Sequence, residues 1–134
     1  MTNTGIVRVA DVMEPDYVVV NGVDTVGDAV ATLLERKSRF LIVDKRNDDD
    51  EFGVVMISDI AKQVLARNRS PERINVYEIM SKPVLSVKPD MDIRYCARLF
   101  DRFGVSAAPV IDAGEIKGIV TYEELVLNGL AKQW

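Results

Sequence analysis

Acidic side chains carry most of the chemistry that this sequence could perform. The chain has 21 Asp and Glu residues, 17 Lys and Arg residues, no histidine and one cysteine, Cys96. Without histidine it can build neither a Ser-His-Asp or Cys-His catalytic group nor a His-ligated metal site. An enzyme that uses paired carboxylates is the remaining catalytic alternative. No metal constellation and no glycine-rich phosphate loop supports it, so we expect a protein that is not an enzyme.

Two further features could hold a metal or act as a redox group. The run Asp48-Asp49-Asp50-Glu51 offers carboxylate oxygens to Ca²⁺ or Mg²⁺. A metal-binding loop needs spaced ligands and a turn glycine, so four adjacent acids at a hairpin tip are expected to be solvated. Cys96 falls on the apolar stripe of a predicted helix and is expected in the core. We therefore predict no metal site and no cofactor.

Length and composition are typical of a small soluble protein. A chain of 134 residues with a net charge of −4 and 48% hydrophobic residues forms one compact domain or two very small ones. No apolar run approaches the ~20 residues of a membrane-spanning helix, and the first residues lack a secretion-signal pattern. Mild acidity argues against non-specific nucleic-acid binding, and one unpaired thiol fits a reducing compartment. We expect a cytoplasmic protein that binds neither membranes nor nucleic acid.

The sequence contains one pattern written twice. Residues 9–13 (VADVM) recur as 76–80 (VYEIM), residues 38–44 (SRFLIVD) as 106–112 (SAAPVID), and residues 53–60 (GVVMISDI) as 118–125 (GIVTYEEL). The shift between copies is 67 for the first match and 68 for the second, and it falls to 65 for the third because the first copy carries a longer loop at 45–52. We place repeat 1 at residues 8–69 and repeat 2 at residues 75–132, with the polar segment 67–73 as a linker.

Each copy is predicted to fold as β-α-β-β-α. In the first, residues 17–20 predict a strand, and apolar residues at 26, 29, 30, 33 and 34 predict a helix with one buried stripe, capped by Asp24 or Thr25. Residues 40–44 and 52–57 predict a hairpin, and residues 60–65 a second helix. In the second copy, strands are predicted at 84–87, 108–112 and 116–121 and helices at 93–103 and 122–130. A half of this size is marginal alone, so the copies are expected to share an interface.

This tandem arrangement resembles the cystathionine-β-synthase (CBS) domain pair, also called a Bateman module. The signature residues are the pairs Val12-Met13 and Ile79-Met80, the segment 105–112 (VSAAPVID) and the segment 118–121 (GIVT). The resemblance implies an α/β (α+β) fold of two CBS repeats packed about a pseudo-twofold axis. It also implies a non-catalytic regulatory module that binds adenosine-type ligands such as AMP, ADP or ATP in the cleft between its repeats and pairs into a flat dimer.

In nucleotide-binding members the segment Gly-apolar-apolar-Thr/Ser-x-x-Asp joins the last strand to the last helix. A helix N-terminus attracts phosphate, a hydroxyl donates to phosphate oxygens, and a carboxylate accepts ribose hydroxyls. Copy one keeps Ser58 and Asp59 but has Met56 at the hydroxyl position, whereas copy two keeps Thr121 but has Glu124 for the aspartate. The resemblance implies Ser58 and Thr121 as phosphate contacts, and Asp59 and Glu124 as ribose contacts.

A basic residue often precedes the apolar strand in phosphate-binding members. Arg39 has that place in copy one, and its guanidinium suits a phosphate. Ala107 and Ala108 follow at the matching place in copy two, where they leave room for a purine or simply pack tightly. Because Arg39, Ser58 and Asp59 belong to one copy, we expect the stronger site there and a weaker one in copy two.

Each candidate also has a purely structural interpretation. Thr121 and Glu124 match a Thr-x-x-Glu capping box. Ser58 matches a helix cap, Asp59 a first-turn carboxylate favoured by the helix dipole, and Arg39 a solvated residue at a strand end. Under this interpretation the protein is a structural or interaction dimer with a degenerate ligand pocket.

The last predicted helix is more apolar than one buried stripe requires. It contains Leu125, Val126, Leu127 and Leu130, and Trp134 lies just beyond it. We therefore expect a homodimer with Leu127 or Trp134 near the contact. The sequence names neither the ligand nor the protein that such a module would regulate.

Overall fold

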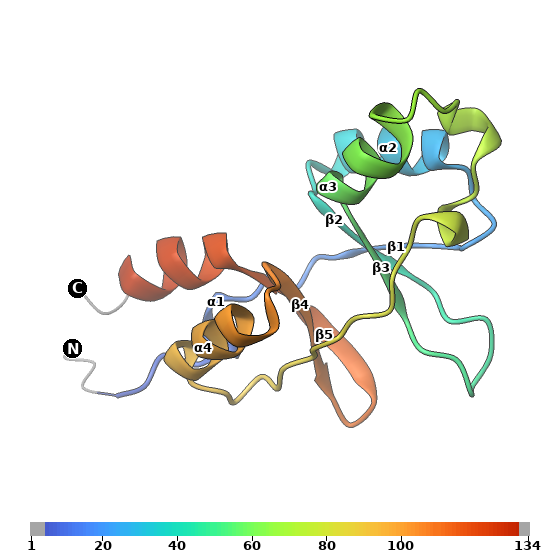
Figure 1. Cartoon of the computed structure of the whole chain (residues 1–134). Helices are drawn as coiled ribbons and strands as arrows, with labels where there is room; N and C mark the ends of the chain where they lie inside the picture. The colour runs from blue at the N-terminus through green and yellow to red at the C-terminus, as the bar shows by residue number, and fades with distance from the viewer. Residues whose placement is uncertain (1–4, 132–134) are drawn as a thin grey trace. The chain divides into compact units, whose positions relative to one another are not determined.

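The chain folds into two compact units, each with its own hydrophobic core. The structure is a computed structural model that describes residues 5–131. Unit 2 is the chain Tyr17–Pro83, and unit 1 combines the N-terminal segment up to Asp16 with the chain from Val84 onward (Figure 1). The expected α/β fold of small sheets and helices is confirmed. No helix in the described part of the chain is long and apolar enough to cross a membrane.

Unit 2 is a three-stranded sheet whose helices α2 and α3 lie beside each other (Figure 1). Its elements are β1 (Val18–Val20), α2 (Val26–Arg36), β2 (Phe40–Val43), β3 (Gly53–Met56), α3 (Ile57–Ile60), the π-helical η1 (Ala61–Leu65) and the 3₁₀ turns η2 (Pro71–Arg73) and η3 (Val76–Glu78). Strand β2 is central, parallel to β1 and antiparallel to β3. The second of the two predicted caps begins α2, because the Thr25 hydroxyl oxygen accepts the Asp28 N–H at 3.1 Å.

The predicted buried stripe of α2 is narrower than expected. Val26, Ala29 and Leu33 are buried, but Val30 is 41% exposed and Leu34 is 80% exposed. These two side chains face away from the sheet because a helix advances about 100° per residue, and a three-stranded sheet covers one side of it. An apolar strip of α2 is therefore left on the surface.

Unit 1 has the same order of elements with one strand missing. It contains α1 (Val9–Val12), α4 (Ile93–Phe103), β4 (Ala107–Asp112), β5 (Glu115–Thr121) and the π-helical η4 (Glu124–Leu130). Strands β4 and β5 form the predicted antiparallel hairpin, and its turn residues Ala113 and Gly114 both have positive φ, 52° and 79°. Two such residues give a turn whose twist matches that of the strands.

The strand predicted at residues 84–87 is wrong. Only Val87 forms a bridge there, parallel to Val110; its N–H donates to the Pro109 carbonyl at 3.1 Å and its carbonyl accepts the Ile111 N–H at 2.9 Å. The next bond along such a parallel ladder would come from the N–H of residue 109. Proline has no N–H, so the ladder ends after one pair.

The register of the repeats also corrects the alignment by one residue. Val20 pairs with Val43 in unit 2, and Val87 pairs with Val110 in unit 1. Both members of the second pair lie 67 residues beyond those of the first, so the shift stays at 67 up to the hairpin instead of rising to 68. Matching serines and aspartates suggested the slipped alignment. In the structure Arg39 corresponds to Ser106, not to Ala107.

Each short lead segment packs on the opposite repeat. Val9 and Val12 belong to the core of unit 1, whereas Val76 and Ile79 belong to that of unit 2. Backbone hydrogen bonds extend both contacts, between Glu14 and Ile119 at 2.7 and 2.9 Å and between Ser81 and Val54 at 2.8 and 3.1 Å. Each compact unit therefore combines the strands and helices of one repeat with the lead segment of the other.

Candidate functional site

The candidate residues of copy one meet where β3 passes into α3. Phe40 pairs with Met56 across the β2–β3 ladder. One step further, the Ile57 N–H donates to the Arg39 carbonyl oxygen at 3.4 Å. Arg39 is therefore held beside the first turn of α3, the turn that contains Ser58 and Asp59. The backbone of Arg39 is thus joined to the residue next to Ser58 and Asp59, the two other residues that the resemblance assigns to this site.

Asp59 has a structural bond as well as a predicted ligand role. Its Oδ2 accepts the Met56 N–H at 2.8 Å, which satisfies one of the free donors at the start of α3. This is the first-turn carboxylate of the structural interpretation. A carboxylate has two oxygens, and this bond uses Oδ2 alone. Ser58 lies one residue earlier in the same turn and is exposed; the helix is capped at Met56, so the interpretation of Ser58 as the cap is wrong.

In copy two, the residues at the equivalent junction between strand and helix hydrogen-bond to each other. The Thr121 N–H donates to Glu124 Oε1 at 3.0 Å, and the Thr121 hydroxyl donates to the same oxygen at 2.7 Å. The Tyr122 N–H donates to the Ser106 carbonyl at 3.2 Å, which reproduces the bond between Ile57 and Arg39. Thr121 and Glu124 thus bond to each other, and a serine stands where copy one has its arginine.

The same carboxylate contact occurs at both lead segments. The Arg8 N–H donates to Asp11 Oδ2 at 2.9 Å, and the Asn75 N–H donates to Glu78 Oε2 at 2.8 Å. Four helix starts therefore use an acid three residues further on to satisfy a backbone donor. An acid three residues after the start of each helix was the sequence signal for this capping contact. The contact gives Asp59 and Glu124 a structural role that is independent of any ligand.

The two alanines of copy two differ in exposure. Ala107 is half-buried and pairs with Thr121 across the hairpin, whereas Ala108 is fully buried in the core of unit 1 beside Val110 and Val120. Ala108 therefore packs tightly, as the alternative interpretation held. Ala107 keeps part of its surface exposed.

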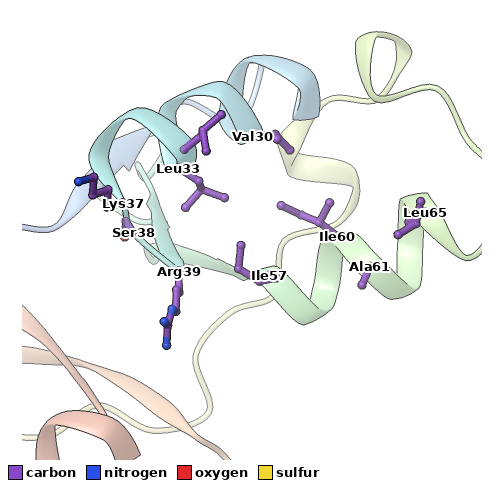
Figure 2. A pocket seen from close by; sticks show the side chains of 10 residues that line it. Val30, Leu33, Lys37, Ser38, Arg39, Ile57, Ile60, Ala61 and Leu65 are labelled. Carbon is purple, nitrogen blue, oxygen red and sulfur yellow. The ribbon is translucent and has the colours of Figure 1, made fainter.

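An apolar groove runs between α2 and the helix formed by α3 and η1 (Figure 2). Its volume is about 540 Å³, and it is lined by Val30, Leu33, Leu34, Lys37, Ser38, Arg39, Ile57, Ile60, Ala61 and Leu65. Figure 2 shows Arg39 at the end of the groove away from Leu65, with its guanidinium directed away from the apolar side chains. Sequence reasoning missed this groove because it treated Val30 and Leu34 as core.

Family comparison decides what these repeats are. The model of the CBS domain matches residues 9–66 and again residues 76–129. The chain belongs to the CBS domain family. Its two CBS domains are the two sequence repeats, and the candidate residues of CBS repeat 1 are the basic residue before β2 and the hydroxyl and carboxylate at the start of α3.

Solved structures share this fold, and curated proteins match the sequence. A hexameric CBS-CP12 protein from bloom-forming cyanobacteria is 34% identical, with a TM-score of 0.89 over 93% of this chain and 73% of that one. The CBS domain pair of protein MJ0100, in complex with 5′-methylthioadenosine and S-adenosyl-L-methionine, is 23% identical, with a TM-score of 0.80 over 96% of this chain and 99% of that one. The L-aspartate semialdehyde sulfurtransferase of Methanosarcina acetivorans is 35% identical over 87% of this chain, a stretch that is 23% of that enzyme. This chain covers 40%, 43% and 59% of the length of three other curated relatives.

The acidic loop of CBS repeat 1 is anchored by cations of the chain itself. Asp50 Oδ2 accepts the Arg46 N–H at 2.9 Å and Arg46 Nε at 3.2 Å, while Lys82 Nζ donates to Asp50 Oδ1 at 3.0 Å. The Arg46 N–H, then Lys82, hold the pKa of the Asp50 carboxyl well below its usual value. Across residues 5–131, no three Asp, Glu or Cys side chains are grouped so as to hold a metal ion. Sequence reasoning missed Lys82, which lies more than thirty residues away.

Cys96 is part of the core of unit 1. Its side chain is fully buried on α4 with Val9, Ile93 and Phe100, which confirms the prediction that it is a core residue. Burial raises the pKa of the thiol to about 11, so it is protonated at neutral pH.

Proposed function

We propose that the chain is a non-catalytic regulatory module that binds an adenosine-type ligand, chiefly in CBS repeat 1. CBS domain pairs are generally regulatory rather than catalytic. The observation that carries the proposal is the bond from the Ile57 N–H to the Arg39 carbonyl, because it brings a cation beside the first turn of α3. In repeat 2 the same bond brings a neutral serine instead.

Each group then has a distinct role toward the ligand. Arg39 pairs with a phosphate, and Ser58 donates to it at a helix start whose free N–H groups also favour an anion. Asp59 accepts the ribose hydroxyls with Oδ1 while Oδ2 keeps its bond to Met56. The site in repeat 2, with Thr121 and Glu124, is weaker because a ligand there must first break the bond between them.

The phosphate distinguishes among adenosine derivatives. The MJ0100 domain pair holds 5′-methylthioadenosine and S-adenosyl-L-methionine, neither of which carries a phosphate. In this chain Arg39 favours an anionic ligand such as AMP, ADP or ATP. We therefore expect affinity for AMP to depend on Arg39 and affinity for methylthioadenosine to be independent of it.

Calorimetric titration of AMP and methylthioadenosine into four proteins tests these roles. Asp59→Asn keeps an oxygen that can accept the Met56 N–H but removes the charge offered to the ribose. It should weaken both ligands by roughly tenfold or more, the equivalent of about 1.5–3 kcal/mol. Arg39→Ala should weaken AMP alone, and Arg67→Ala, a change of an exposed arginine in the linker, should leave both unchanged.

A second candidate function is a structural or interaction dimer with a degenerate pocket. The closed pair of Thr121 and Glu124 favours it, as does Met56 in place of a hydroxyl. No heat of binding from AMP, ADP, ATP or methylthioadenosine at millimolar concentration would establish this alternative and overturn the ligand assignments.

Both candidate functions, the ligand-binding module and the structural dimer, include self-association of the chain. On unit 1, Tyr122 is 39% exposed, Val126 49%, Leu127 67% and Leu130 44%, which is a contiguous apolar face of one helix. Trp134, the other residue expected near the contact, lies outside the described residues. Light scattering at micromolar protein should give at least twice the 14.9 kDa mass of the chain. A concentration-independent monomer mass would contradict this.

A further inference from the structure

We infer that the outer face of α4 in unit 1 is a docking surface for an acidic amphipathic helix of another protein. This face carries two parallel rows of side chains, one basic and one apolar, which the equivalent helix of unit 2 lacks. Neither the proposed ligand site nor the apolar face of η4 includes any residue of these rows.

The arginine row consists of Arg94, Arg98 and Arg102, which are all exposed. Residues four apart lie on one side of a helix, at steps of about 6 Å along its axis. Arg94 is bound at the start of its own helix, because its Nη2 donates to Asp92 Oδ2 at 3.0 Å. Arg98 and Arg102 form no hydrogen bond and no ion pair with any residue between 5 and 131. Both guanidinium groups are therefore available to a partner.

The apolar row consists of Tyr95, Leu99 and Phe103, each one residue beyond an arginine. Tyr95 is 51% exposed and Phe103 is 49% exposed, and Leu99, between them in the row, is half-buried. A different side of α4 packs on the core of unit 1, and it carries Ile93, Cys96 and Phe100. Arginine and aromatic side chains are both enriched where one protein binds another.

Helix α2 of unit 2 shows that the CBS fold requires neither row. It has the same length as α4, and a shift of 67 residues matches its three buried residues to the three of α4. The same shift gives the residues of α2 that replace the two rows: Gly27, Ala31 and Glu35 for the arginines, and Asp28, Thr32 and Arg36 for the apolar residues. The two helices thus agree on the buried side and differ on the outer face.

Helix stability does not account for the arginine row. Like charges four residues apart on a helix repel each other. Arg94 lies in the first turn, where the helix dipole opposes a cation, and only Arg102 lies in the last turn, where the dipole favours one. The bond to Asp92 offsets the cost at Arg94, but Arg98 has no such bond. A binding role explains the row better than a structural one.

An acidic helix fits both rows in step. Acidic and apolar residues that each recur every fourth position on a partner helix repeat at the same distance as the rows of α4. A guanidinium binds a carboxylate through two parallel hydrogen bonds, which arginine forms and lysine does not. Tyr95 and Phe103 then pack on the apolar residues of the partner, and burial of this surface favours the association.

Acidic surroundings disfavour a long polyanion or an anionic membrane as the occupant. Across residues 5–16 and 84–131, acidic residues outnumber basic ones ten to six. Asp90 and Asp92 precede the arginine row, and Asp101 lies along the side of it that is away from the apolar row. Nucleic acid or a membrane would extend over these carboxylates, whereas a short helix can be confined to the two rows.

Nuclear magnetic resonance with a designed peptide tests the docking surface. The probe is a helical peptide of about 20 residues with glutamate and leucine each at every fourth position, and its control has glutamine in place of glutamate. Titration of the probe into the isotope-labelled chain should shift the amide signals of residues 94–103, and the control should shift them far less. No shift at millimolar probe, or shifts confined to other elements, would overturn the inference.

Variants of the rows separate this occupant from others. Arg98→Gln combined with Arg102→Gln should raise the dissociation constant of the probe roughly five- to tenfold, and Phe103→Ser should also raise it. Arg67→Gln, a change of an exposed arginine in the linker, should leave it unchanged. Binding of duplex DNA or of phosphatidylserine vesicles more tightly than the probe would overturn the inference. So would a lower light-scattering mass of the double variant, because α4 would then be a contact between copies.

Discussion

Replacing Gly118 by alanine should break the pairing between Glu14 of the first lead segment and Ile119 of β5. A Cβ built on Gly118 would lie 2.7 Å from the Glu14 carbonyl oxygen and 3.0 Å from the Met13 sulfur. The sulfur can move by a side-chain rotation, but the oxygen belongs to the backbone that pairs with Ile119. Relief of the clash therefore breaks the hydrogen bonds between Glu14 and Ile119, at 2.7 and 2.9 Å.

The expected cost follows from those two bonds. Each contributes about 0.5–1.5 kcal/mol, and alanine returns roughly 0.5–1 kcal/mol because it is less flexible than glycine in the unfolded chain. The net loss in the free energy of unfolding should be about 0–2.5 kcal/mol, with a midpoint near 1.3 kcal/mol. Gly53→Ala is the matched variant in unit 2: its nearest atom, at 2.7 Å, is the Met80 sulfur, which can rotate away. It should stay within about 1 kcal/mol of wild type.

Urea denaturation of the wild type, Gly118→Ala and Gly53→Ala measures these differences, with Gly27→Ala as a helix control. The added Cβ of Gly27 meets its neighbours at an ordinary 3.7 Å, so this variant should gain about 0.5–1 kcal/mol. Hydrogen exchange should show faster loss of the Glu14 and Ile119 amide protons in Gly118→Ala alone. The reasoning fails if Gly118→Ala is as stable as Gly53→Ala.

Three further outcomes are expected. Cys96→Ala should lose roughly 1 kcal/mol of stability through lost packing and keep its ligand response, and the native thiol should resist thiol reagents because its pKa is raised to about 11. Lys82→Ala should raise the pKa of Asp50 toward 3.8 in an NMR titration. A lowered carboxyl pKa stabilises the fold above pH 3.8, and this stabilisation is lost as the pH falls through the folded-state pKa. The wild type and the variant should therefore differ in melting temperature at neutral pH and converge in acid. Ca²⁺ should leave the wild-type melting temperature unchanged, and a rise that Asp48→Ser with Asp49→Ser abolishes would reveal a metal site.

The repeat and most of its elements could be predicted because they depend on local periodicity. The apolar residues at 93, 96 and 100 are buried on α4 as expected, and the pair Ala113-Gly114 forms the expected hairpin turn. The prediction of a strand at residues 84–87 failed because a single missing backbone donor outweighed the apolar pattern. Pro109 fits an apolar run, but the N–H it lacks is the donor that a longer strand at residues 84–87 requires.

Contacts between residues far apart in the sequence could not be predicted either. Nothing local in the sequence shows that Val9 and Val76 pack on opposite repeats or that Lys82 reaches Asp50, because these contacts depend on how the chain is wound. The candidate site was predicted as a set of residues from the resemblance, and the structure adds one backbone bond that holds Arg39 beside the first turn of α3. The ligand roles of Arg39, Ser58, Asp59, Thr121, Glu124, Ala107 and Ala108 stay predictions.

Identification of any small molecule that the protein retains through purification tests the central claim most directly. The freshly purified chain is denatured, the released compounds are separated, and their masses are determined. The account predicts an adenosine compound, with a phosphate if Arg39 acts as proposed, and less of it from Asp59→Asn prepared in parallel. A wild-type protein that releases no adenosine compound and also fails to bind AMP added at millimolar concentration would contradict the account.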